Sequence, residues 1–173
     1  MRARNGYLTV AAAKSDAARR RRQEYQDEGR RLARRTGAGY ASGCMLFWAE
    51  GSRRRNSIEF TNSDLAMAGV FVDFLRRYFD VEGRIRLSCN LFAAHEERQR
   101  EIEDFWPAVA ALPRTCLRPS TVNRYSRWSN RKRLNKLPYG TARVSVPDTR
   151  IVQTLYGSIQ ELAGFERPEW LDL

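Results

Sequence analysis

Residues 43–52 read GCMLFWAEGS, a largely apolar run that ends in an acid, a glycine and a serine. The run predicts the second half of a helix, and Gly51 is a natural helix stop. Gly39, Gly43 and Phe47 recur at intervals of four, so they share one face of that helix. Two glycines on one face let another backbone approach closely, which is typical of a tightly packed helix pair.

Downstream of this run, alternating and helical patterns follow one another. Alternation of polar and apolar residues predicts strands, and Asn62-Ser63-Asp64 is a strong helix start. We expect strands at 57–61, 84–89 and 141–146, and helices at 36–52, 65–79, 95–112 and 148–163. This order predicts an α+β fold in which helices pack on a small antiparallel sheet.

The residues ahead of this domain form a basic segment. We expect residues 1–35 to be a basic N-terminal arm or helix and residues 36–173 to be the domain. Residues 11–35 can form a helix but contain few large apolar side chains. Two interpretations stay open: a solvated helix or disordered arm, or a basic arm along a phosphate backbone with Arg19 to Arg22 as its densest part.

Positive charge is concentrated in two blocks of the chain. The net charge is +11 and the isoelectric point is about 10.3. Residues 1–55 carry 14 Lys/Arg and 5 Asp/Glu, and residues 114–150 carry 10 and 1. Residues 56–113 carry 6 and 10, and residues 151–173 carry 1 and 4. Charge segregated in this way is typical of a protein that binds nucleic acid, here most simply duplex DNA.

The second block mixes basic side chains with hydroxyl, amide and aromatic ones. Between residues 114 and 136 there is no acid, whereas a purely solvating face would normally include some. Such a mixture is what contacts to phosphates and base edges use. The predicted nucleic-acid-binding residues are Arg53, Arg54, Arg55, Arg118, Ser120, Thr121, Asn123, Arg124, Tyr125, Arg127, Asn130, Arg131, Lys132, Arg133, Asn135, Lys136 and Arg143.

Glu50 is the acid that stands out, because it follows an apolar run and precedes a glycine and three arginines. It is either a solvated carboxylate at a helix end or a catalytic ligand of Mg²⁺, a cation that prefers carboxylate and water oxygens beside substrate phosphates. One carboxylate per chain is too few for a catalytic site. A homodimer that packs two copies of the glycine-bearing helix would bring two Glu50 side chains together.

Other classes fit the composition poorly. Cys44, Cys89 and Cys116 are far apart and His95 is the single histidine, which argues against a zinc finger. The odd cysteine count suggests a reducing compartment, so we expect a cytoplasmic protein associated with DNA. No apolar run reaches the roughly 20 residues of a membrane span.

The run at 43–52 resembles the LAGLIDADG motif of homing endonucleases, in which a packed helix ends in an acid, a glycine and a small polar residue. Trp48 stands where that motif has its first acid. The stretch from Gly43 to Trp170 is more similar still to a family of bacterial and phage proteins, through the runs FWAEGS (47–52), FTNSD (60–64), CNLFA (89–93), STVNRYS (120–126), NKLPYGT (135–141), IVQTLYGSIQE (151–161) and FERPEW (165–170).

The resemblance implies a LAGLIDADG-like fold and a homodimer that cleaves long DNA sites with Mg²⁺ held by Glu50. Relatives that keep the fold as regulators imply an alternative, a DNA-binding protein without catalysis. Splicing helpers that use the same fold imply a third, an RNA-binding protein.

Overall fold

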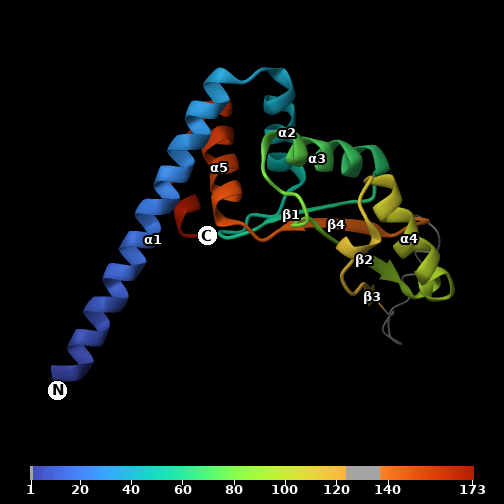
Figure 1. The fold of residues 1–173 in the computed structure, drawn as a ribbon, viewed down its shortest axis with the longest axis horizontal. Helices are drawn as coiled ribbons and strands as arrows, with labels where there is room; N and C mark the ends of the chain where they lie inside the picture. The colour runs from blue at the N-terminus through green and yellow to red at the C-terminus, as the bar shows by residue number, and fades with distance from the viewer. Residues whose placement is uncertain (1, 124–136) are drawn as a thin grey trace, which may run out of the picture. The chain divides into compact units, whose positions relative to one another are not determined.

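The computed structural model describes residues 2–123 and 137–173 and contains five α-helices and a four-stranded sheet within them (Figure 1). In chain order the elements are α1 (Arg2–Arg35), α2 (Ala38–Glu50), β1 (Ile58–Asn62), α3 (Leu65–Tyr78), β2 (Arg86–Phe92), α4 (Gln99–Val109), β3 (Thr121–Asn123), β4 (Thr141–Val146) and α5 (Thr149–Ala163). Short 3₁₀ turns span Ala93–Arg98, Arg114–Cys116 and Pro168–Leu171. The predicted α+β class is confirmed. None of the described helices has the length and apolar character that crossing a lipid bilayer requires.

The sheet has the strand order β1-β4-β2-β3. β4 pairs antiparallel with both β1 and β2, whereas β3 pairs parallel with β2. The prediction of a wholly antiparallel sheet was therefore wrong at its β3 edge. The chain between β2 and β3 includes α4, and a helical connection of this kind returns the chain to pair in the same direction. Alternation in a sequence identifies a strand but carries no information about its direction.

One face of the sheet forms the core with α3 and α4. Alternate strand residues are buried on this face, and α3 lies on it in Figure 1. Phe60 of β1 stacks on Phe71 of α3, with ring centroids 4.3 Å apart. Phe47 of α2 stacks on the same ring at 5.9 Å. The apolar face of α2 that carries Phe47 is thus occupied within the chain.

Local sequence explains where α3 begins. Asp64 is its N-cap, and the carboxylate accepts a hydrogen bond from the Met67 backbone N–H at 3.0 Å. The Asn62 side chain in turn accepts from the Asp64 backbone N–H at 2.8 Å. The helix start predicted at Asn62-Ser63-Asp64 is confirmed, with side chains satisfying backbone donors that have no intrahelical partner.

The chain divides into two compact units. The sheet unit comprises the described parts of Met45–Ser52 and Ile58–Pro147, and it contains the sheet with α3 and α4. The helical unit comprises the described parts of Met1–Cys44, Arg53–Ser57 and Asp148–Leu173, and α1 packs along α5 within it. Residues 11–35 are helical, which agrees with the helix among the alternatives left open by the sequence.

Two glycines set how closely α1 and α5 approach. A Cβ on Gly29 of α1 would overlap the backbone carbonyl of Thr154, and a Cβ on Gly157 of α5 would overlap that of Gln26. The two backbones therefore meet directly, each through the other's glycine. This explains how a helix with few large apolar side chains can still be packed.

Polar side chains fill the rest of this contact. The Gln26 amide donates to the Gln153 side-chain oxygen at 2.7 Å and accepts from the Gln160 amide at 3.0 Å. The Ser158 hydroxyl donates to the Gly29 carbonyl at 2.9 Å. All these side chains are buried, and no buried side-chain polar atom of the described residues lacks a partner. A satisfied polar interface of this kind favours one relative position of the helices.

Ion pairs border the same contact. In four of the five pairs an arginine of the basic N-terminal block meets an acid of the acidic C-terminal block, and in the fifth Arg150 meets Glu28 of α1. The pairs are Arg19 with Asp172, Arg22 with Asp172, Arg30 with Glu166, Arg34 with Glu161 and Arg150 with Glu28. Arg19 and Arg22, half of the arginines in the densest part of the predicted arm, thus have partners within the chain.

The three cysteines are free and buried, and this predicts their reactivity. Burial raises the pKa of Cys44 to about 12 and that of Cys89 to about 11. Since the thiolate is the reactive form, the native protein at pH 8 should resist a thiol-reactive disulfide reagent, whereas the denatured protein should react at all three thiols.

Cys44 and Cys89 also contribute to the stability of the folded protein below the unfolded-state pKa of about 9, and that contribution should be lost as the pH rises through their folded-state pKa values. Labelling kinetics and chemical denaturation at pH 8 and pH 11 measure both effects. Rapid labelling of native protein would contradict the burial.

Candidate nucleic-acid interface

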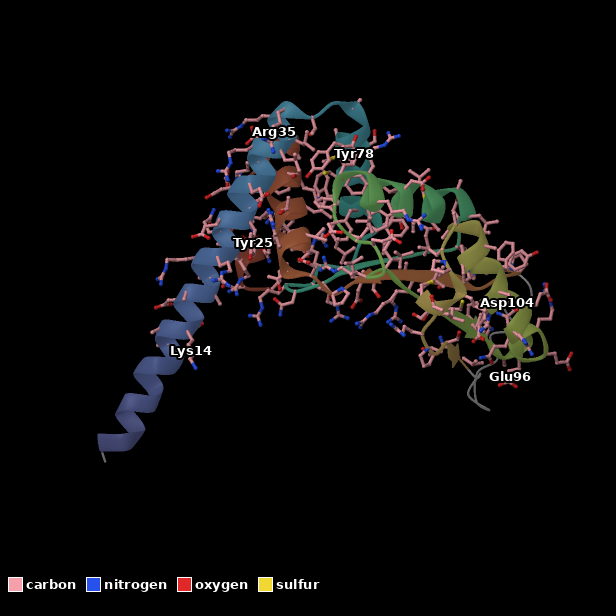
Figure 2. All side chains as sticks on the ribbon, viewed as in Figure 1. Lys14, Tyr25, Arg35, Tyr78, Glu96 and Asp104 are labelled. Carbon is pink, nitrogen blue, oxygen red and sulfur yellow. The ribbon has the colours of Figure 1, made fainter. Side chains whose placement is uncertain are left out.

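The second face of the sheet is polar. Strand alternation places hydroxyl, amide and charged side chains opposite the apolar face, and these side chains are half-buried or exposed. Figure 2 shows side chains standing out from the strands on the side away from α3. We call this surface the polar sheet face; its members on the three longer strands are Glu59, Thr61, Arg86, Ser88, Asn90, Thr141, Arg143 and Ser145.

Arg143 lies at the middle of this face, on a central strand. It pairs in register with Thr61 of β1 and Ser88 of β2. Its guanidinium donates to the Asn90 side-chain oxygen at 3.1 Å, and the Asn90 amide donates to the Thr141 hydroxyl at 3.2 Å. One nitrogen of Arg143 thus orients the guanidinium. No other side chain among the described residues accepts a hydrogen bond from its remaining N–H groups. A guanidinium held in this way is preorganised for a planar acceptor.

Two more of the predicted residues share this face. Thr121 lies opposite Asn90, and Asn123 lies opposite Phe92, in the parallel pairing of β3 with β2. Both side chains are exposed. The structure therefore brings Thr121, Asn123 and Arg143 together on one surface.

The structure places the other described candidates elsewhere. The Ser120 hydroxyl donates to Glu103 of α4 at 2.7 Å, so Ser120 points to the helix side of the sheet. Arg118 is tied by its backbone N–H to the Leu87 carbonyl at 2.7 Å, and its side chain borders a small concavity with Arg76. Ser120 directly precedes Thr121, whose register partner Asn90 belongs to the polar face, so alternation turns Ser120 toward the buried face.

The arginine turn at Arg53, Arg54 and Arg55 belongs to the helical unit. Its backbone is held by α5: the Tyr156 hydroxyl donates to the Arg54 carbonyl at 2.9 Å, and the Gln153 amide donates to the Arg55 carbonyl at 3.1 Å. All three arginine side chains are exposed. The turn therefore presents its cations from a fixed backbone.

Nine predicted contacts lie outside the described residues. They are Arg124, Tyr125, Arg127, Asn130, Arg131, Lys132, Arg133, Asn135 and Lys136. Their segment joins β3 to β4 along the chain, and both strands belong to the sheet.

Glu50 is the last residue of α2 and is exposed. Its carboxylate accepts from the Asn62 amide at 3.3 Å, and the same amide contacts the Met67 sulfur at 3.3 Å. Gly51 is required next to it, because a Cβ there would run into Phe47. In the described part of the chain, no three His, Cys, Asp or Glu side chains are grouped as a metal site. A single Glu50 therefore does not fit a catalytic Mg²⁺ on its own.

Sequence reasoning missed most of the polar sheet face. Arg86, Ser88 and Asn90 are the polar members of the alternating run RLSCNLF, and Thr61, Thr141 and Ser145 occupy the same positions in the other strands. The alternation that predicted the strands also indicates which side chains share the solvent face. The predicted contacts were instead concentrated at residues 114–136, where basic residues are densest.

Comparisons of the chain with protein-family models, with curated proteins and with solved structures found no match. The polar sheet face combines guanidinium, amide and hydroxyl groups on adjacent strands, and such groups can hydrogen-bond to phosphate oxygens and to the edges of bases.

Proposed function

We propose that this protein binds duplex DNA through the polar sheet face. The observation that carries the proposal is the hydrogen-bonded set Arg143, Asn90 and Thr141, which lies in the middle of that face. The major groove accepts strands as well as helices, and a sheet can present many side chains to it at once.

The side chains on this face suit base-edge contacts. Arginine can bind the two acceptors of a guanine, asparagine can bind adenine, and serine or threonine can bind either partner of a base pair. The face holds two arginines, Arg86 and Arg143, with Thr121 and Asn123 at its β3 edge. A carboxylate, Glu59, belongs to the same face and suits the exocyclic amine of cytosine.

The charge distribution supports the same partner. Residues 114–150 carry ten basic residues and one acid, and six of the basic residues lie between Arg124 and Lys136, the segment that joins β3 to β4. In the N-terminal block, Arg19, Arg30 and Arg34 are paired with C-terminal acids. The dense run of basic residues at 124–136 lies between two strands of the sheet in sequence, and it would supply salt-dependent affinity for phosphates.

Titration of a labelled random-sequence DNA duplex across a salt series tests this proposal. We expect affinity to fall linearly on a log–log plot, with a slope of about −0.9 per phosphate contact. Single-stranded RNA is added as a competitor, because it distinguishes a DNA-binding protein from an RNA-binding one. Displacement of the duplex by equimolar RNA would favour that alternative and count against DNA.

Magnesium-dependent cleavage by a homodimer is a second candidate, supported by the surroundings of Glu50. The carboxylate is exposed at a helix end, and large apolar side chains are exposed in the same helix and at the start of α3: Trp48 at 39%, Leu65 at 38% and Met67 at 37%. Met67 and Glu50 also contact the same Asn62 amide. Such a surface could pack against a second copy, which would supply the second carboxylate that one chain lacks.

Replacing Glu50 by Gln separates the cleaving protein from the non-catalytic regulator. If cleavage occurs, Glu50→Gln should lower Mg²⁺-dependent nicking of plasmid DNA by at least about 100-fold and change duplex affinity less than about twofold. Glu97→Gln, another exposed acid, is the matched control and should nick like the unmodified protein. Equal nicking by all three proteins would exclude Glu50 as a metal ligand. Absence of nicking by the unmodified protein, with duplex binding intact, identifies a regulator.

A further inference from the structure

An open concavity lies within the helical unit, between the N-terminal half of α1 and the turn after Arg53. Four basic residues border it: Lys14, Arg21 and Arg22 from α1, and Arg55 from the turn. Lys14 and Tyr25, both labelled in Figure 2, mark the stretch of α1 concerned. We call this feature the basic groove.

The sequence of α1 explains the hollow. Ser15, Ala17 and Ala18 line it and have small side chains, which leave space beside the helix. Lys14 and Arg21 are seven residues apart, so they project from the same face about 10 Å from each other along the axis. Long cationic side chains therefore stand at intervals above a floor of small ones.

The charge of the basic groove is uncompensated. No acidic side chain lines it. Among the described residues, Lys14, Arg21 and Arg55 have no ion-pair partner, whereas Arg19, Arg30 and Arg34 on the same helix each pair with a C-terminal acid. Arg22 is the exception within the groove, since it donates to the Leu171 carbonyl and to Asp172. Three cations are thus left facing one concavity.

The second wall of the basic groove is rigidly held. The Arg55 carbonyl accepts from the buried Gln153 side chain at 3.1 Å, so the backbone that carries the Arg55 side chain is anchored to α5. Asn56 beside it accepts from the Thr149 hydroxyl at 3.4 Å. The groove therefore has a fixed cation on one side and a helical row of cations on the other.

We propose that the basic groove binds consecutive phosphate groups of a nucleic-acid backbone. The proposal rests on the proposed function and adds a second contact surface to it, on the helical unit. Lys14 and Arg21 stand two helical turns apart on one side of the groove and Arg55 stands on the other, so its row of cations suits a chain of phosphates. The hydroxyls of Ser15 and Tyr25 and the amide of Asn56 can donate hydrogen bonds to the same oxygens.

The test compares two triple variants of equal charge on the full chain. The groove variant carries Lys14→Gln, Arg21→Gln and Arg55→Gln. The control variant carries Arg20→Gln, Arg31→Gln and Arg35→Gln, three exposed arginines of α1 outside the groove. Each is titrated with the labelled duplex across a salt series, and a sheet-face variant that carries Arg86→Gln and Arg143→Gln is titrated beside them.

We expect the groove variant to flatten the salt slope by two to three units, at about 0.9 per contact, and the control variant by less than one. Equal slopes for the two triple variants would overturn the groove assignment. If the sheet-face variant still loses affinity in that case, the proposed function stands without the groove. If the unmodified protein binds no nucleic acid, the proposed function fails as well.

A second pair of variants tests the floor of the groove without removing any cation. Ala18→Glu puts a carboxylate in the hollow, and Ala13→Glu puts the same charge on an exposed position of α1 outside it. Ala18→Glu should weaken duplex binding at least tenfold and Ala13→Glu less than threefold. Equal effects would contradict the assignment. Poly-glutamate serves as a competitor in a third titration. If it displaces the duplex from the unmodified protein but not from the groove variant, the groove binds acidic protein segments and not nucleic acid.

Discussion

Replacing Gly157 by Ala should destabilise the helical unit by about 3 kcal/mol or more, the upper range for overpacking a buried site. The added Cβ would overlap the Gln26 backbone carbonyl on α1, and backbone atoms cannot rotate away as a side chain can. The helices would have to separate, which would stretch the hydrogen bonds from Gln26 to Gln153 and Gln160. Gly29→Ala should have a similar effect, since its Cβ would meet the Thr154 carbonyl.

Thermal unfolding followed by circular dichroism measures this effect. For a chain of 173 residues, a loss of 3 kcal/mol corresponds to a fall in Tm of about 6–12 °C. Gly37→Ala is the matched control, because nothing lies within 4 Å of its added Cβ. It should unfold within about 2 °C of the unmodified protein. A Gly157→Ala protein as stable as that control would show that α1 does not pack on α5 as described.

Removing the two arginines of the polar sheet face should cost the largest part of duplex affinity. Arg86→Gln with Arg143→Gln removes both cations while keeping polar side chains that suit the strands. At about 1–3 kcal/mol for each arginine in contact with a base or phosphate, we expect affinity for duplex DNA to fall by roughly 30-fold or more. The salt slope should flatten by about two units.

The matched control for this variant removes equal charge from the helices. Arg77→Gln with Arg100→Gln changes two exposed arginines of α3 and α4, the helices that cover the opposite face. The control should bind within about threefold of the unmodified protein, because a general loss of positive charge acts only through screened long-range attraction. Equal losses in the two variants would show that the sheet face makes no specific contact.

Several helix ends could be predicted from the sequence, because neighbouring residues along the chain determine them. The end of α2 at Glu50 agrees with the expected stop before Gly51, where a side chain would meet Phe47. The start of α3 follows from the Asp64 cap. The helix expected at 148–163 ends at Gly164, whose left-handed φ of 69° explains why glycine stands there.

Other features depend on contacts between distant parts of the chain, which no local pattern reveals. The packing of α1 on α5 depends on Gly29, Gly157 and a buried glutamine network, none of which produces an apolar stripe. The direction of β3 depends on the path of the chain around α4. Residues 11–35 contain few large apolar side chains, and a prediction that expects buried helices to contain them therefore assigns these residues to an exposed arm.

The candidate site was predicted in part. Thr121, Asn123 and Arg143 lie on the polar sheet face, while Ser120 faces α4 and the arginine turn belongs to the helical unit. Charge density identifies which segments are rich in cations but not which strand face their side chains occupy. Register decides that, and a shift of one residue exchanges the two faces.

Modification of arginines by phenylglyoxal in the unmodified protein, with and without duplex DNA, tests the central claim most directly. Mass spectrometry of the peptides gives the modification rate of each arginine. We expect the duplex to slow modification of Arg86 and Arg143 at least several-fold and to leave modification of Arg77 and Arg100 unchanged. Slower modification of Arg77 and Arg100, with Arg86 and Arg143 unaffected, would contradict it and move the DNA to the helix-covered side of the sheet unit.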